Sequence, residues 1–507
     1  MTSVEVGTAY GVVRGRVEQE LAVFRGIPFA QPPVGELRFA APVVPDAWDG
    51  VRDADAFGPP PPQSGPALVP SAATGDDWLT LNVWSPQHRS EGEALPVLVW
   101  FQGGAYISGA SSDPMYDGAQ LARQGVVLVT FNYRVGAEGW ARIEGAPDNR
   151  GLLDQLTALE WVRDNIGSFG GDPARVTVCG ESAGAGSIAT LLTVERAAGL
   201  FRRAVAQSVP GMYCTPEFAS DFTAALTDRL GVAPTVAGLG AVAPERLAEE
   251  IGGFLREMPA HGDRWGRAGH LAAPFSPVLD GELVPETPWQ ALRDGRANGV
   301  ELLTGHTQDE FRLFLAMMGS PEFSEAAADI ALRRFAPTAK GGEDFDGPAA
   351  YRAAFPGATP GELFETVQSD VLFRMPTARL AEANAAAGGT TYLFELTWPA
   401  PGMGGALGAC HSLDVPLLFG TFDSPSGRMV LGENPGDEAR ALSAEIRDAW
   451  VAFVKDADPG WAPYDAEGRR ARVFDGKGSA AAVPYPEEAS RRIWAGADIE
   501  PFDLPEK

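Results

Sequence analysis

The sequence predicts an α/β protein with a doubly wound, mostly parallel sheet. Residues 97–101 and 126–131 are continuous apolar runs, typical of strands buried on both faces beneath helices. Between the second run and a third strand at 175–179, apolar residues recur with helical spacing over 152–166. This alternation of strands and helices predicts the fold class.

The remaining elements are placed around that sheet. Residues 11–14 and 21–25 are predicted to form N-terminal antiparallel strands. The stretch 58–75 is rich in Pro, Ser, Ala and Gly and is predicted to be a surface loop. Residues at about 215–270 and 317–390 have helical patterns and are interpreted as insertions between strands. No linker or repeat divides the chain, so a single domain over residues 1–507 is expected.

Composition excludes several classes of protein. The chain of 507 residues has 40 Lys and Arg against 67 Asp and Glu, a net charge of −27 that disfavours nucleic-acid binding. Its apolar runs are shorter than the roughly 20 residues of a membrane-spanning helix. The N-terminus has no pattern of a secretory signal, and three cysteines are too few for a disulfide framework. A cytoplasmic protein without a membrane span is therefore expected.

The sequence Gly-Glu-Ser-Ala-Gly at 180–184 lies between the third strand and a helix. A G-x-S-x-G motif in that context raises a serine hydroxyl on a sharp strand-to-helix turn, where the glycines leave room for neighbouring backbone. Ser182 is the candidate nucleophile. The amide of Ala183 lies at the start of the following helix, where negative charge is stabilised.

A serine nucleophile needs a base that takes its proton and an acidic residue that orients the base. Of the five histidines, His411 fits the chain order serine, acid, histidine, with Asp309 or Glu310 as the acid. His306 with Asp280 is the alternative base and acid.

The loop Gln102-Gly103-Gly104-Ala105 follows the strand at 97–101. Its small residues allow close approach of backbone amides to a substrate, so the loop is predicted to supply oxyanion-hole donors.

The chain resembles the type-B carboxylesterase family, which includes bacterial para-nitrobenzyl esterases and, more distantly, the cholinesterases. The resemblance runs from about residue 4 to about 475. It is carried by the motif around Ser182 and by segments similar to family signatures at 24–30, 32–39, 76–84, 149–166 and 169–173.

The resemblance implies an α/β-hydrolase fold with helical insertions around the mouth of the active site. It implies Ser182 as nucleophile, Glu310 rather than Asp309 as acid, and His411 as base. It also implies that the amides of Gly104, Ala105 and Ala183 are the oxyanion donors and that Ser208 hydrogen-bonds the acid. Leu313 and Phe314 are implied to lie near the substrate pocket.

Three positions depart from the family pattern. Gln102 replaces the usual histidine before the oxyanion glycines, which is expected to alter hydrogen bonding around the site. Trp78 occupies the position of a disulfide cysteine, and Val209 replaces a glycine after Ser208. None of these changes removes a catalytic group. Asp414, three residues after His411, is interpreted as a structural partner of the site.

The predicted function is that of a serine carboxylesterase that acts on small-molecule esters, of the short-chain or aryl type, through an acyl-enzyme. An amidase or carbamate hydrolase with the same triad is the alternative, and a non-catalytic binding protein of the same fold is a second one. No metal or cofactor is expected. The sequence leaves the natural substrate and the oligomeric state open and is compatible with a monomer.

Overall fold

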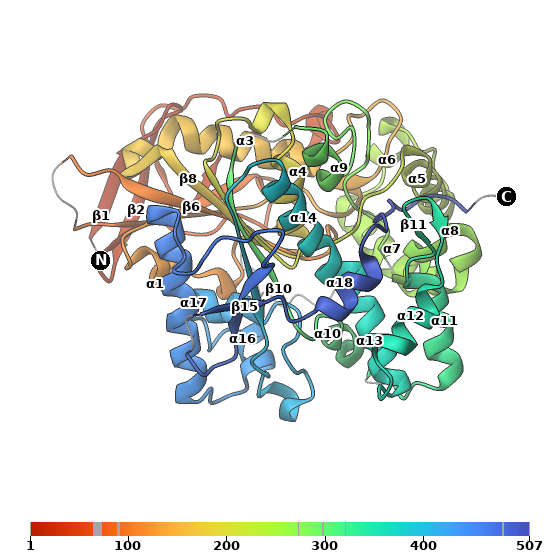
Figure 1. Ribbon diagram of the computed structural model, residues 1–507. Coiled ribbons are helices and arrows are strands. Elements are labelled where there is room, and N and C mark those ends of the chain that lie inside the picture. Colours follow the sequence, from red (N-terminus) through yellow and green to blue (C-terminus); the bar gives the residue numbers. More distant parts are fainter. Residues whose placement is uncertain are drawn as a thin grey trace.

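A twisted sheet crosses the centre of the computed structural model, with helices on both faces (Figure 1). The structure describes residues 2–63, 74–88, 92–271, 273–296, 299–319, 321–478 and 481–505. Most of the predicted loop 58–75 therefore lies outside the described residues. Among those residues the main sheet has 13 strands, in the order β1-β2-β3-β5-β7-β6-β8-β9-β10-β13-β14-β15, with β4 beside β2.

The strands of the main sheet are β1 Ser3–Gly7, β2 Val12–Glu18, β3 Leu21–Pro28, β4 Val51–Asp53, β5 Thr80–Pro86, β6 Leu95–Phe101, β7 Val127–Phe131, β8 Gly171–Glu181, β9 Arg203–Gln207, β10 Glu301–Thr307, β13 Thr391–Leu396, β14 Arg470–Phe474 and β15 Ala482–Pro484. Strands β1, β2, β3 and β5 form the antiparallel part, as the N-terminal hairpin pattern predicted. From β7 to β14 every neighbouring pair is parallel.

The parallel strands are apolar on both faces because each face has its own core. In β6, Val97, Val99 and Phe101 pack into one hydrophobic cluster, and Leu98 and Trp100 pack into the other. Side chains of a strand alternate between faces, so a run without polar residues is what two covered faces require.

Helices cover the sheet. In the described chain, the α-helices outside the two predicted insertions are α1 Ala119–Ala122, α2 Gly136–Trp140, α3 Arg150–Asn165, α4 Ala183–Leu191, α9 Pro288–Arg293, α10 Arg312–Met317, α15 Asp414–Phe419, α16 Pro425–Leu431, α17 Asp437–Asp456 and α18 Glu488–Trp494. The predicted helix at 152–166 corresponds to α3. No helix in the described chain is long and apolar enough to cross a bilayer.

The stretches predicted as insertions are helical. The first contains α5 Pro216–Leu230, α6 Val236–Gly240, α7 Pro244–Glu257 and α8 Gly262–Leu271. The second contains α11 Glu325–Phe335, the short strands β11 Ala339–Lys340 and β12 Glu343–Asp344, α12 Gly347–Ala354, α13 Pro360–Ser369, the π-helical turn η6 Asp370–Arg374 and α14 Met375–Ala386.

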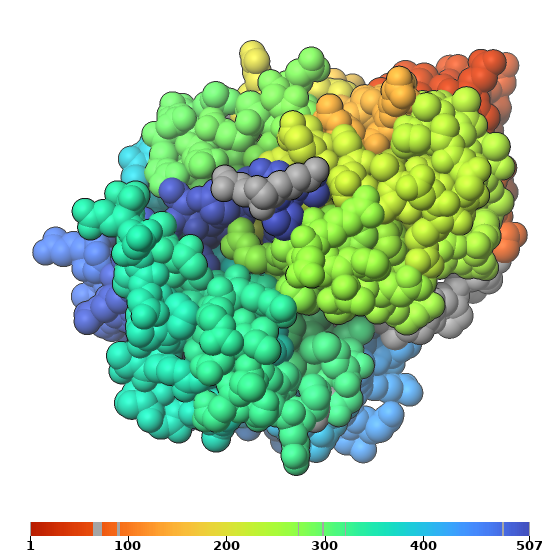
Figure 2. Space-filling model, turned by 90° about the vertical axis from the view of Figure 1, so that its right-hand side faces the viewer, coloured from red at the N-terminus to blue at the C-terminus, as the bar shows by residue number. Residues whose placement is uncertain are grey.

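Figure 2 shows the two insertions on one face of the molecule, with the C-terminal segment between them. Hydrogen bonds support this placement, since Thr215 contacts Asp503 and Arg379 contacts the carbonyl of Ala497. The assignment of the whole chain to a single domain stays a prediction.

Candidate active site

Ser182 lies on the turn between β8 and α4. Its backbone has φ 56° and ψ −126°, a conformation that side chains rarely adopt. The turn is held by a 3.0 Å hydrogen bond from the Ser182 amide to the Gln207 carbonyl. A Cβ on Gly180 would lie 2.8 Å from the carbonyl oxygen of Phe101, and one on Gly184 would collide with the same oxygen. Both glycines of the motif are therefore required by close backbone packing.

The loop after β6 lies beside this turn. A Cβ on Gly103 would lie 3.0 Å from the Cβ of Ser182. Gly104 and Ala105 have φ of 119° and 53°. The Gly104 carbonyl accepts hydrogen bonds from the amides of Ile107 and Ser108, whereas the backbone hydrogen bonds of the described residues use neither the Gly104 nor the Ala105 amide. The loop thus has unpaired donors near the serine.

The third amide predicted for this role belongs to Ala183, the first residue of α4. An amide in the first turn of a helix has no acceptor within the helix, and the helix dipole adds partial positive charge there. The arrangement can stabilise an oxyanion on a substrate held at Ser182.

His411 and Glu310 meet across the site. Nδ1 of His411 lies 2.5 Å from Oε2 of Glu310. The other oxygen of this carboxylate accepts hydrogen bonds from the Thr307 amide at 2.9 Å and from Oγ of Ser208 at 2.6 Å. Glu310 is fully buried and His411 is 3% exposed. Such an arrangement fixes the ring and its tautomer, as a hydrolytic triad requires.

Burial and charge act in opposite directions on this pair. Burial raises the pKa of Glu310, but His411 and the hydroxyl of Ser208 outweigh it, so the pKa is lowered. Burial lowers the pKa of His411, but the carboxylates of Glu181 and Glu310 outweigh that effect and raise the pKa to about 9.

A second carboxylate faces the same imidazole. Oε1 of Glu181 lies 3.1 Å from Nε2 of His411 and accepts a 2.6 Å hydrogen bond from Oγ of Ser412. Each ring nitrogen therefore has a carboxylate partner, and among the described residues no hydrogen bond joins Ser182 to the ring. Sequence reasoning assigned no role to Glu181 or Ser412, although both lie next to predicted catalytic residues.

The alternative acid, Asp309, points elsewhere. Its Oδ2 accepts a 2.8 Å hydrogen bond from the Ala409 amide, and its Oδ1 forms an ion pair with Arg312. Asp309 therefore holds the backbone of the segment that carries His411, while the imidazole contacts Glu310.

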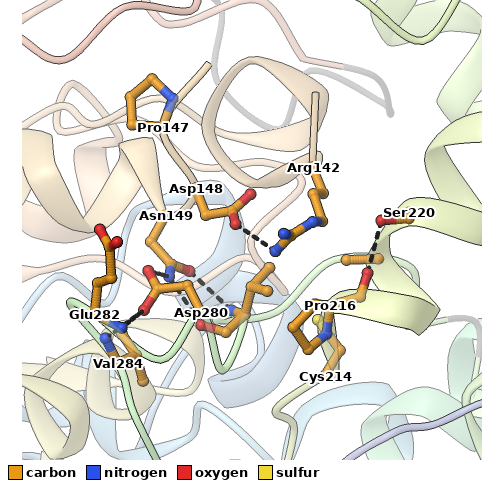
Figure 3. Close-up of polar contacts among 12 residues, drawn as sticks. Arg142, Pro147, Asp148, Asn149, Cys214, Pro216, Ser220, Asp280, Glu282 and Val284 are labelled. Carbon is orange, nitrogen blue, oxygen red and sulfur yellow. Dashed lines mark hydrogen bonds and ion pairs between the residues drawn. The ribbon is translucent and has the colours of Figure 1, made fainter. Parts of the chain in front are cut away.

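The alternative base and acid are not together. His306 contacts the Tyr485 hydroxyl through Nε2 at 2.6 Å and the Thr307 carbonyl through Nδ1 at 3.0 Å. Asp280 accepts hydrogen bonds from Asn149 and from the amides of Glu282 and Val284, as Figure 3 shows. The structure pairs both residues with other partners.

Other predicted residues also have defined surroundings. The Gln102 side chain is fully buried, and its backbone carbonyl accepts a hydrogen bond from the Tyr133 hydroxyl. Asp414 is buried and accepts a 2.5 Å hydrogen bond from Nε2 of Gln207. Burial raises the pKa of Asp414 to about 7.

Aromatic rings line the imidazole. The Phe314 ring lies 5.4 Å from the His411 ring and the Phe373 ring lies 4.2 Å from it. Leu313 and Phe314 belong to α10, which has no buried residue. Phe373 lies on η6, and sequence reasoning did not predict its place at the site, because the periodicity of a helix does not show a π-helical turn.

No group of three or more metal-ligating side chains occurs in the part of the chain that the structure describes. The three cysteines are buried and have free thiols.

A serine on a strand-to-helix turn, at the carboxyl edge of a doubly wound sheet, defines this protein as an α/β-hydrolase. Ser182, Ser208 and Glu310 each follow a parallel strand at that edge.

The chain belongs to the carboxylesterase family, whose model matches residues 2–468. It is 36% identical to the para-nitrobenzyl esterase of Bacillus subtilis, over 94% of this chain and 95% of that protein. It is also 36% identical to the phenmedipham hydrolase of Pseudarthrobacter oxydans, over 89% of this chain and 90% of that protein. The crystal structure of a Geobacillus stearothermophilus carboxylesterase superposes with a TM-score of 0.83 at 33% identity, covering 97% of this chain and 99% of that one. The protein is accordingly a carboxylic ester hydrolase, and the predicted fold and enzyme class are confirmed.

Proposed function

We propose that the enzyme hydrolyses short-chain or aryl carboxylic esters by two-step acyl transfer with Ser182 as nucleophile, His411 as base and Glu310 as the acid that orients it. The observation that carries the proposal is the continuous contact from Ser208 through Glu310 to His411, whose ring also contacts Glu181, the residue before the serine on the strained turn. Strained backbone conformations and buried, hydrogen-bonded charges are costly, and they cluster at functional sites, where the surrounding structure maintains them.

In the first step, Nε2 of neutral His411 takes the proton of the Ser182 hydroxyl as its oxygen attacks the ester carbonyl. The amides of Gly104, Ala105 and Ala183 stabilise the resulting oxyanion. His411 then gives the proton to the leaving alcohol. Water hydrolyses the acyl-enzyme by the same route, and Glu310 stabilises the imidazolium in both steps.

The proposed substrate class rests on the rings beside the base. Phe314 and Phe373 are nearly parallel, with 9° between their planes and 6.0 Å between their centroids. Flat aromatic walls close to the imidazole favour an aryl or a short acyl group through stacking and apolar contact.

The experiment measures hydrolysis of para-nitrophenyl esters from acetate to decanoate by the wild type and by Ser182→Ala. Ser220→Ala, on the exposed face of α5, is the matched control. We expect the wild type and the control to hydrolyse the short esters and Ser182→Ala to fall to background. A folded Ser182→Ala variant with wild-type rates would overturn the proposal.

The same assay separates the related chemistries. We expect the acetate ester to be hydrolysed faster than a para-nitroanilide or an aryl carbamate. Equal rates on the anilide or the carbamate would replace the ester proposal with an amidase or carbamate-hydrolase function of the same triad.

A further inference from the structure

Glu181 has no part in the acyl transfer described above, yet its carboxylate lies against the base. Its Oε1 is 3.1 Å from Nε2 of His411, the nitrogen that must receive the Ser182 proton. The Glu181 side chain is only 5% exposed, so this contact is shielded from water and from salt.

Two neighbours hold the Glu181 carboxylate in place. Ser412 has φ 63°, an unfavourable conformation for a residue with a side chain, and its hydroxyl donates a 2.6 Å hydrogen bond to Oε1. On the other side, a Cβ on Gly103 would lie 2.8 Å from Oε2. The carboxylate therefore occupies a gap between the oxyanion loop and the segment that carries His411.

The protonation state of the ring depends on the charges of its two carboxyl partners. An imidazole donates from both nitrogens only when it is protonated, and a neutral ring with its proton on Nδ1 would turn a lone pair toward an ionised Glu181 carboxylate. Burial raises the pKa of Glu181, while the imidazolium of His411 and the hydroxyl of Ser412 act against that shift. The titratable groups that act on the ring are Glu181, Glu310 and Asp414, all carboxyls. The rings of Phe314 and Phe373 cover it and add no charge.

We propose that Glu181, held by Ser412, is a positioning residue that binds the Nε2 proton of His411 in the resting enzyme, so that the protonated imidazole contacts Glu181 rather than Ser182. The inference rests on the proposed role of His411 as base. The proton on Nε2 passes to water before the ring accepts the proton of Ser182. The pair thus sets the pH at which the enzyme becomes active.

The test is the pH dependence of kcat/KM for para-nitrophenyl acetate, because the acid limb of that profile reports the base of the free enzyme. In Glu181→Gln the imidazolium loses one of its carboxylate partners. We expect the acid limb to move to lower pH by about one unit or more. Glu181→Asp restores the charge, and we expect its limb to lie between those of the wild type and Glu181→Gln.

Ser412→Gly provides a second variant that does not strain the backbone, because glycine adopts positive φ freely. Without the Ser412 hydroxyl, the ionised form of Glu181 is less stable and binds the imidazolium less strongly. We expect a smaller shift of the acid limb in the same direction. If Glu181→Gln does not fold, Ser412→Gly decides the proposal by the same criterion.

Glu250→Gln, on α7, is the control. It also removes the charge of a buried carboxylate, but this carboxylate pairs with arginines outside the site. An unchanged acid limb in folded Glu181→Gln, or an equal shift in Glu250→Gln, would overturn the positioning role. Failure of the proposed function is distinguishable, because Ser182→Ala would then retain activity.

Discussion

Oγ of Ser208 donates a 2.6 Å hydrogen bond to Oε1 of Glu310, the carboxylate whose other oxygen contacts His411. Ser208 lies just after β9 and Glu310 just after β10, and these strands are neighbours in the parallel sheet. The sheet register therefore brings the serine beside the carboxylate that contacts His411.

We expect Ser208→Ala to lower kcat/KM for para-nitrophenyl acetate by roughly tenfold, because a hydrogen bond to a buried charge contributes about 1.5–3 kcal/mol. Without this donor the pKa of Glu310 rises and the imidazolium is less well stabilised. Steady-state kinetics measure the effect, with Ser220→Ala as control. A wild-type kcat/KM would show that Ser208 has no influence on the triad.

Neutralising Glu310 and neutralising its neighbour Asp309 should have different effects on activity and stability. Glu310→Gln should lower kcat by roughly 10⁴, the size of effect known for loss of a triad carboxylate. Asp309→Asn should keep most of the activity and instead lower the melting temperature, because Asp309 holds the backbone of Ala409. Kinetics and thermal unfolding of both variants test this. Activity loss in Asp309→Asn alone would reverse the assignment.

A buried ion pair supports the segment after β7. Asp154 accepts hydrogen bonds from the amide, Nε and Nη2 of Arg134, and both side chains are at most 1% exposed. Removing one charge of such a pair leaves the other uncompensated, so we expect Asp154→Asn to cost about 3–5 kcal/mol of unfolding free energy in urea.

The exposed pair Arg163–Asp164 on α3 is the matched control. Asp164→Asn should change the unfolding free energy by less than about 1 kcal/mol, since solvent screens a surface pair. Similar losses in the two variants would contradict the role of burial.

The buried carboxyl group of Glu365, on α13, is expected to make the free energy of unfolding depend on pH. Its Oε1 accepts a hydrogen bond from Ser369, whose hydroxyl accepts one from the amide of Phe311, next to Glu310. Burial raises the pKa of Glu365 from 4.5 to about 7, although Arg374 acts against this shift. Because the folded-state pKa is the higher one, its contribution to stability is present below about 4.5 and is lost as pH rises toward 7.

We therefore expect Glu365→Gln, which cannot ionise, to raise the melting temperature relative to the wild type more at pH 8 than at pH 5. Each unit of pKa shift corresponds to about 1.4 kcal/mol. Thermal unfolding at the two pH values measures the difference. An equal difference at both values would contradict a raised pKa.

Several features of the fold could be predicted because their causes are local. The apolar run at 97–101 and the helical spacing at 152–166 reflect burial that each segment needs by itself, and they correspond to β6 and α3. The turn at Ser182 could be predicted for the same reason, since its glycines are needed where the adjacent backbone leaves no room for a Cβ atom.

Features of the site that depend on distant segments were harder to predict. The residue pattern left Asp309 and Glu310 equivalent, and only the resemblance to the family preferred Glu310. The structure turns Glu310 toward His411 and Asp309 toward Ala409. The side chains of two consecutive residues point in different directions. Which of the two carboxylates contacts the imidazole therefore depends on where the segment carrying His411 packs.

The sequence by itself determined the doubly wound sheet and the turn at Ser182, because hydrophobic periodicity and glycine sterics act between near neighbours in the chain. Its resemblance to a family indicated the enzyme class. Only the tertiary structure decided that Glu181 and Glu310 face opposite nitrogens of one imidazole and that Phe373 covers its ring. Those contacts join segments far apart in sequence, and their geometry is set by sheet register and helix packing.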